Sequence, residues 1–253
     1  MTTPAILEPI AERAWPARES ARVGEWRLNA SDGWSGRINS CRIQGAPDRP
    51  FGKAIDMAEA WFAERGLAPI FKLILGREPD VAGPLIERGY EPGAATLVMT
   101  GRPGALADRA IRIEPTIGDS FRRVFSEGQF GAAEDAAERL GAFERTSTPR
   151  GFAVLEDHKV PTAIGVTAVD ATWFGVMGMR TLVAHRRKGF GRRILRALCA
   201  FAAGEDAQLA WLQVMAGNEP ALDLYRSEGF SEAYRYRYWR KRADLNREPG
   251  EES

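Results

Sequence analysis

The chain has 253 residues, of which 44% are hydrophobic and 27% charged, and its formal net charge at neutral pH is +1. This composition is ordinary for a globular protein and excludes a disordered chain, which would be poorer in apolar residues. No apolar run reaches the roughly eighteen residues of a membrane-spanning helix, and the amino terminus lacks the basic start and apolar core of a secretory signal. We therefore expect a cytoplasmic protein that associates with no membrane.

Cysteines and histidines are too few and too scattered to predict a metal centre. Cys41 and Cys199 match no metal-ligand spacing and are typical of small buried thiols in a reducing compartment. Only His158 and His185 could supply imidazole ligands, so we expect no metal. Positive and negative charges balance in both halves of the chain, which argues against a dedicated nucleic-acid-binding protein.

The first part of the chain predicts short helices and strands. A helix is indicated by "EPIAERAWPARE", and two strands joined at Asp32-Gly33, a common hairpin signal, are indicated by "GEWRLNASDGWSGRINSCRI". From Ala58 the predicted order is helix, strand, helix, glycine-aromatic turn and strand. Glycine and proline then punctuate "TGRPGALADR", which predicts a boundary between one unit at residues 1–103 and another at 104–253.

The second unit is predicted to start with a strand and helix in "AIRIEPTIGDSFRRVF" and a further helix in "EDAAERLGAFER". Three strands follow, with turns near Asp157–Lys159 and Asp170–Thr172. Apolar residues at helical spacing then predict an amphipathic helix in "GRRILRALCAFAA". A short buried strand, a helix and a final strand complete the unit.

Two parts of the chain resemble each other at an offset of 140 residues. The segment from Ala58 aligns without a gap on the segment from Leu198, and both predict the same order of elements. Gly89-Tyr90 then falls on Gly229-Phe230. We therefore expect two related α/β units.

Positive charge and glycine are concentrated in Val183–Leu195, "VAHRRKGFGRRIL", between a predicted strand and a predicted helix. Free N–H groups at the start of a helix bind anions, glycines let the anion approach closely, and arginines add charged hydrogen bonds. No P-loop signature is present, and the dinucleotide fingerprint fails because Ile194 stands in place of its third glycine. The segment therefore predicts a pyrophosphate site, and an ordinary solvated face is the alternative.

The remaining pattern, Arg-x-x-Gly-x-Gly from Arg186 to Gly191, resembles the acyl-CoA signature of the GNAT superfamily, the GCN5-related N-acetyltransferases. Downstream, the asparagine and the Leu-Tyr before Gly-Phe in "NEPALDLYRSEGF" also resemble that family. The resemblance covers roughly residues 109–242 and implies an α/β fold, α+β in some schemes. Its sheet would be mixed and mostly antiparallel, with splayed parallel strands flanked by helices. Residues 1–103 would be a partial, degenerate GNAT-like unit, as in bacterial two-part GNAT proteins.

The same resemblance implies a site for acetyl-CoA as co-substrate. The pantetheine arm would lie between the splayed strands, and the pyrophosphate would sit on backbone N–H groups of the glycine-rich turn. Asn218 would hydrogen-bond the cofactor arm or order the loop; the alternatives are that it only caps the following helix, or that it is both cap and ligand. The residues expected to bind the cofactor are Thr181, Leu182, Val183, Arg186, Arg187, Lys188, Gly189, Phe190, Gly191, Arg192 and Asn218.

The resemblance further implies that a primary amine, on a small molecule or a protein, attacks the thioester directly in a ternary complex. Tyr225 would protonate the departing thiolate, because a phenol with a pKa of about 10 suits a thiolate of about 8.5. A packing aromatic is the alternative role of this tyrosine. Glu127, Glu134 and Glu144 lie where the acceptor site is usually shaped, but each is more typical of a solvated surface carboxylate, and the general base is not identified.

The internal offset predicts that the first unit has no such site. Ala46–Phe51 aligns with Arg186–Gly191 but has no glycine before the helix, a single cation and two prolines that remove N–H donors. Glu78 and Leu85 take the positions of the asparagine and the tyrosine. We expect this unit to bind no pyrophosphate and to pack on the second unit, where it could wall the acceptor cleft.

An N-acetyltransferase is therefore the predicted function, and a non-catalytic acyl-CoA-binding regulatory protein is the alternative. A nucleic-acid-binding module using "HRRKGFGRR" is disfavoured because both halves are nearly neutral. The alternating aromatic and basic residues of "AYRYRYWRKR" are better explained by a strand with one buried face. The family often forms homodimers, so a homodimer is one expected assembly, while the acceptor stays undefined.

Overall fold

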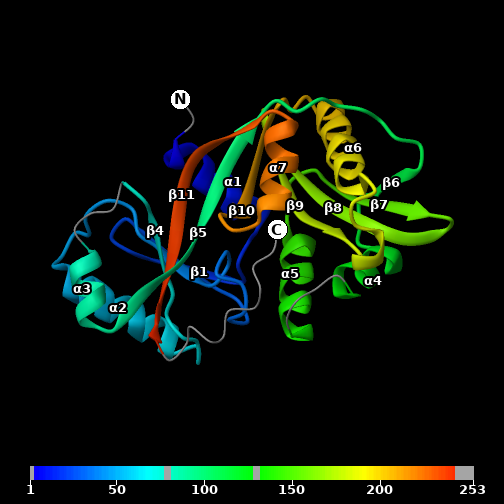
Figure 1. The fold of residues 1–253 in the computed structure, drawn as a ribbon. Coiled ribbons are helices and arrows are strands. Elements are labelled where there is room, and N and C mark those ends of the chain that lie inside the picture. Colours follow the sequence, from blue (N-terminus) through cyan, green and yellow to red (C-terminus); the bar gives the residue numbers. More distant parts are fainter. Residues whose placement is uncertain (1–2, 77–80, 128–131, 243–253) are drawn as a thin grey trace.

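A computed structural model describes residues 3–76, 81–127 and 132–242. These residues form one continuous sheet of eleven strands in the order β1-β2-β3-β4-β11-β5-β10-β9-β8-β7-β6, with helices packed against it (Figure 1). Neighbouring strands are antiparallel except for β3 with β4 and β9 with β10. The predicted mixed, mostly antiparallel α/β fold is confirmed.

The elements of the first half are α1 (Pro4–Ala14), β1 (Glu19–Val23), β2 (Trp26–Ala30), β3 (Ser40–Arg42), α2 (Phe51–Ala63), β4 (Phe71–Ile74), α3 (Ala82–Glu87) and β5 (Tyr90–Gly101). Those of the second half are β6 (Ile111–Glu114), α4 (Asp119–Glu127), α5 (Ala133–Arg145), β7 (Arg150–Asp157), β8 (Val160–Asp170), β9 (Trp173–Thr181), a 3-10 turn (Val183–His185), α6 (Phe190–Gly204), β10 (Leu209–Met215), α7 (Glu219–Ser227) and β11 (Phe230–Lys241).

The two halves are joined through their last strands. β11 lies between β4 and β5, and β5 lies between β11 and β10, so each half completes the sheet of the other. Thr96 pairs with Tyr236, and these two residues occupy equivalent positions in the 140-residue repeat. A pseudo-twofold axis therefore passes between β5 and β11, with α2 and α3 toward one end of the molecule and α6 and α7 toward the other (Figure 1). The division at residues 103 and 104 stays a prediction.

The two strands predicted on either side of Asp32-Gly33 are confirmed as β2 and β3, but the tight turn predicted between them is wrong. β2 and β3 do pair antiparallel, but residues 31–39 connect them as a long loop. Its N–H groups donate to side chains: Ser31 and Gly33 to Asn39, and Ser35 to Glu138 of α5 at 2.7 Å. The tight hairpin here joins β2 to β1, a strand that the sequence did not predict. A side chain more than a hundred residues away therefore organises this loop.

Helices cover both faces of the sheet with their apolar sides. Residues of α1, α4 and α5 form one core with Phe152 and Val154 of β7, whereas α6 and α7 form another with Ala153 and Leu155 of the same strand. Successive residues of a strand point to opposite faces, so these are the two sides of the sheet. The helices thereby leave the carboxyl ends of β9 and β10 as the place where a site can open.

Two smaller predictions, on a strand and on the cysteines, are also confirmed. Tyr234, Tyr236 and Tyr238 are buried while Arg235 is exposed, as expected of a strand with one buried face. Both cysteines are buried, and burial, the main cause, raises the pKa of the Cys199 thiol to about 12. None of the described helices is long and apolar enough to cross a membrane.

Candidate functional site

The two central parallel strands separate halfway along their length. β9 and β10 pair from Trp173 with Leu209 to Val176 with Leu212, and the pairing ends there. On its other side β9 has a bulge, since its register with β8 jumps from Met177 to Arg180. Gly178 lies in this bulge with φ of 57°, a conformation that suits glycine. The end of β9 is thus turned away from β10, as expected for splayed strands.

The glycine-arginine loop, residues 186–191, connects this strand to α6. Arg186 is extended, Arg187 has φ of 65°, and Gly189 has φ of 78° before the helix begins at Phe190. Left-handed residues in such a turn direct successive N–H groups to one side, and the first turn of a helix adds N–H groups without helical partners. The loop therefore presents backbone donors and exposed arginines together, which suits a polyanion.

A groove of about 810 Å³ runs from this loop to α7. Asp223 is the one carboxylate that lines it among the described residues, whereas four arginines do so. The groove brings together nine of the predicted site residues: Thr181, Arg186, Arg187, Gly189, Phe190, Gly191, Arg192, Asn218 and Tyr225.

Three predicted residues do not line the groove. The Leu182 N–H donates to the Thr162 carbonyl of β8 at 2.9 Å, which directs it away. Val183 belongs to the 3-10 turn and is 67% exposed. The Lys188 ammonium lies 3.7 Å from the Asp157 carboxylate. Cofactor contacts from these three residues stay predictions that the shape of the groove does not favour.

Within the groove, Asn218 and Arg192 already have partners in the protein. The Asn218 Oδ1 atom accepts from the Ala221 N–H at 3.2 Å, so this residue caps α7. The Arg192 guanidinium lies 2.8 Å from the buried carboxylate of Glu228 and donates to Ser227. The helix-cap interpretation of Asn218 is confirmed, and Arg192 has its backbone N–H rather than its whole side chain to offer a ligand.

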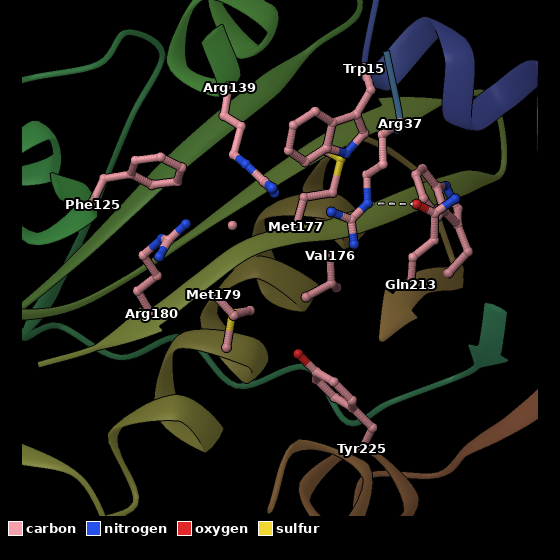
Figure 2. Close-up of a pocket in the computed structure, with 12 residues that line it drawn as sticks. Trp15, Arg37, Phe125, Arg139, Val176, Met177, Met179, Arg180, Gln213 and Tyr225 are labelled. Carbon is pink, nitrogen blue, oxygen red and sulfur yellow. Dashed lines mark hydrogen bonds between the residues drawn. The ribbon is translucent and has the colours of Figure 1, made fainter. Parts of the chain in front are cut away.

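Tyr225 stands where the groove meets a second, smaller pocket. It is 2% exposed, packs against Phe230 with ring centroids 5.8 Å apart, and lines both spaces. Its phenol oxygen points into the second pocket from α7 (Figure 2). Met179 and Arg180 of the bulged strand also line both spaces. The phenol is therefore at the junction of two connected sites.

The second pocket, which we call the arginine pocket, has a space of about 20 Å³. Trp15 of α1 and Arg37 of the 31–39 loop come from the first half of the chain, so that half does wall this end of the site. The full lining is Trp15, Arg37, Phe125, Arg139, Val176, Met177, Gly178, Met179, Arg180, Trp211, Gln213 and Tyr225.

Comparison with known proteins identifies the family to which the chain belongs. Residues 5–239 match the family model described as probable histone acetyltransferase Rv0428c C-terminal. The chain belongs to this family. It is a GNAT-type N-acetyltransferase.

Individual relatives are similar to this chain over most of its length. The uncharacterized N-acetyltransferase YobR of Bacillus subtilis is 26% identical over 243 residues, which is 93% of this chain and 98% of the relative. A GCN5-related N-acetyltransferase from Kribbella flavida superposes with a TM-score of 0.66 at 18% identity, covering 95% and 98% of the two chains. A tandem GNAT protein from the clavulanic acid biosynthesis pathway gives a TM-score of 0.60 at 13% identity, covering 92% and 86%. The two structural likenesses concern the fold alone.

The three glutamates considered as bases of this acetyltransferase line neither space. Glu127, Glu134 and Glu144 are exposed, and the first lies 3.1 Å from Arg123 in an ion pair. Their interpretation as surface carboxylates is therefore favoured. The buried carboxylates of α5 are instead Asp135, which binds Arg139, and Glu138, which holds the 31–39 loop.

The arginine pocket of the acetyltransferase could not be predicted from the sequence. Arg37, Arg139 and Arg180 belong to a loop, a helix and a strand that are far apart in the chain, and none is part of a local motif. One weak feature of the sequence points to the pocket. Arg139 is on the apolar face of α5, where a charged residue requires a partner or a function.

Proposed function

We propose that this protein transfers the acetyl group of acetyl-CoA to a primary amine, by direct attack of the amine in a ternary complex. The observation that carries the proposal is the continuous lining from the glycine-arginine loop to Tyr225 and on into the arginine pocket. The two substrates would occupy the groove and the pocket and would meet at the phenol. Positioning of two reactants in this way is a large part of what such an enzyme has to supply.

The groove suits acetyl-CoA in size and charge. Its volume of about 810 Å³ is in the range of cofactor sites, and its lining is strongly positive. The N–H groups from Arg187 to Arg192 would bind the pyrophosphate, with the guanidinium groups of Arg186 and Arg187 adding charged hydrogen bonds. The separated edge of β9 near Thr181 would receive the pantetheine arm.

Acetyl-CoA supplies the acetyl group as a thioester with a thiolate leaving group. The amine nitrogen would form a bond to the carbonyl carbon as the carbon–sulfur bond breaks. Tyr225 would give its proton to the sulfur, and the proton released by the amine nitrogen would restore the phenol by way of water. The buried position of Tyr225 supports this role because few water molecules compete for the thiolate there.

Two measurements test the proposal. Calorimetry should detect binding of CoA and acetyl-CoA, and a thiol-release assay with a panel of amines should detect turnover. Absence of heat with both ligands, together with an unchanged melting temperature, would contradict the proposed cofactor site. Tight binding without release of thiol from any amine would instead favour an acyl-CoA-binding regulatory protein.

A further inference from the structure

The arginine pocket brings three guanidinium groups to one small space. Arg37 comes from the 31–39 loop, Arg139 from α5 and Arg180 from β9. In Figure 2 the guanidinium groups of Arg139 and Arg180 point toward each other across the pocket. No Asp or Glu is present in the part of the lining that the structure describes. Guanidinium groups that converge on one space offer several charged donors to an anionic ligand placed between them.

Neighbouring groups hold each guanidinium in place. The Arg180 Cζ atom lies 4.2 Å from the ring centroid of Phe125, and that of Arg37 lies 5.5 Å from the ring of Trp15. The Arg37 Nε–H also donates to Gln213 at 2.9 Å (Figure 2). A guanidinium over a ring keeps its N–H groups at the edges, away from the ring face. The pocket is therefore preorganised toward an acceptor of several hydrogen bonds.

Two buried donors of the pocket have no partner in the described part of the protein. They are the Arg139 Nη2 and the Trp211 Nε1 atoms, on side chains that are 2% and 1% exposed. Asp135 neutralises Arg139 through its Nε atom at 2.7 Å but does not use Nη2. Because a buried donor without an acceptor destabilises a protein by about 1–3 kcal/mol, these two atoms point to a ligand that supplies oxygen.

The remaining carboxylates on the far side of Arg37 are already paired. Glu8 contacts Lys72 at 2.6 Å, and Glu12 contacts Arg42 at 3.0 Å.

We propose that the acceptor of this acetyltransferase is a small amine that carries a carboxylate, with the carboxylate bound in the arginine pocket. This proposal rests on the proposed function. Arg37, Arg139, Arg180 and Trp211 would donate to the two carboxylate oxygens, with the guanidinium groups in the paired geometry that they favour. A space of about 20 Å³ accommodates about one or two water-sized groups, which suits a carboxylate and not a longer chain.

The charge of the pocket also determines which amines are excluded. Polyamines and lysine-rich peptides bring extra positive charge toward three guanidinium groups and have no carboxylate to compensate it. For an amine that does bring a carboxylate, the nearby arginines disfavour its ammonium form and favour the neutral nucleophile. Binding and activation of the acceptor would thus come from the same residues.

The first experiment compares matched amines. The twenty common amino acids and their α-amides are assayed for thiol release beside spermidine and N-α-acetyl-lysine amide, with acetyl-CoA binding measured in parallel. We expect at least one amine that carries a carboxylate to be acetylated. The kcat/KM of the corresponding α-amide should be at least tenfold lower. Preference for an amine without a carboxylate overturns the proposal, as does an acetyl-CoA-loaded protein that neither acetylates nor binds any carboxylate amine. Failure to bind acetyl-CoA refutes the proposed function itself.

The second experiment uses variants that leave the groove intact. Arg37→Gln, and Asp135→Asn combined with Arg139→Gln so that no buried charge is stranded, remove donors that do not line the groove. We expect KM for the carboxylate amine to rise at least tenfold in either variant, with the acetyl-CoA dissociation constant and the melting curve close to those of the parent. Arg112→Gln, on exposed β6, is the control. A KM within twofold of the parent in both variants overturns the proposal.

Discussion

The two helix-initiating loops of the molecule occupy equivalent positions in the repeat but differ in chemistry. Gly189 precedes α6 in a left-handed conformation, whereas Pro50, which has no N–H, precedes α2. The exposed arginines of the second loop line a groove, whereas Arg49 of the first loop is paired with Asp48 at 2.6 Å. We therefore expect the same framework to carry an anion site in the second half and none in the first.

The parallel strand pairs show the same contrast in the interior. Pairing ends at Lys72 in the first half and at Leu212 in the second, which are equivalent residues. Beyond this point the second half opens into the site. In the first half Lys72 instead forms a buried ion pair with Glu8, which also lies 3.7 Å from Arg42. The comparison teaches that apolar periodicity preserves a fold while a few polar substitutions decide whether its strands enclose a site or a salt bridge.

The largest effect on activity should come from substitution of Tyr225, which has no equivalent tyrosine in the first half. Tyr225→Phe should lower kcat about 100- to 10,000-fold, because it removes the proton donor for the thiolate. The dissociation constant of acetyl-CoA should change less than threefold. Tyr90→Phe, which removes a phenol bonded to Glu59 in the first half, is the matched control and should retain kcat. A kcat of Tyr225→Phe within threefold of the parent would break the distinction between the halves.

The buried ion pair between Lys72 and Glu8 in the first half should stabilise the fold. Burial alone would raise the pKa of Glu8, but Lys72 and Arg42 bring that pKa below its ordinary value of 4.5. The ionised carboxylate therefore stabilises the fold above this value, and the contribution is lost as the pH falls through the lower pKa of the folded protein. Glu8→Gln should lower the free energy of unfolding by about 3–5 kcal/mol at neutral pH, because it leaves the buried Lys72 without its carboxylate partner.

Denaturant unfolding of the Glu8→Gln variant at several pH values checks this. The difference from the parent should shrink below pH 4.5, where the parent loses the same charge. Glu232→Gln, which removes a partner of Arg235 near the surface, should change stability by less than about 1 kcal/mol. Equal effects of the two substitutions would mean that the buried pair is no more important than a surface pair.

The two loops can be compared through single arginines. Arg186→Gln should weaken acetyl-CoA binding about 10- to 100-fold, since a hydrogen bond to a charged group contributes about 1.5–3 kcal/mol. Arg49→Gln in the first loop should leave the affinity unchanged. Isothermal calorimetry at two salt concentrations measures both, and the loss in Arg186→Gln should diminish at high salt. An equal loss in both variants would argue that the effect is one of overall charge.

The smallest expected effect separates the two roles of Asn218. Asn218→Ala should lower stability by about 1 kcal/mol through loss of the cap on α7. Asn218→Asp keeps an oxygen acceptor and should restore stability, but its negative charge should still weaken acetyl-CoA binding. Thermal unfolding and calorimetry on both variants distinguish a cap from a ligand. Full recovery of both quantities in Asn218→Asp would reduce the residue to a cap.

Much of the second half could be predicted because its signals are local. The turns at Asp157–Lys159 and Asp170–Thr172 and the helix after Gly189 follow from a few consecutive residues. The connection at Asp32-Gly33 is a long loop and not a tight turn, because Glu138, far along the chain, accepts hydrogen bonds from it. Lys188 was expected to bind the cofactor with the other cations of its loop, but its ammonium lies beside the Asp157 carboxylate instead.

The order of elements, the repeat, and the loop with its donors and cations follow from the sequence alone, since periodicity, glycine conformation and charge are properties of short segments. Two features became visible only in the folded chain: β5 and β11 each complete the sheet of the other half, and Arg37, Arg139 and Arg180 surround one pocket. Those features depend on which strands pair and which helices cover them. Long-range contacts of this kind are chosen by the packing of the whole core, and no local pattern records them.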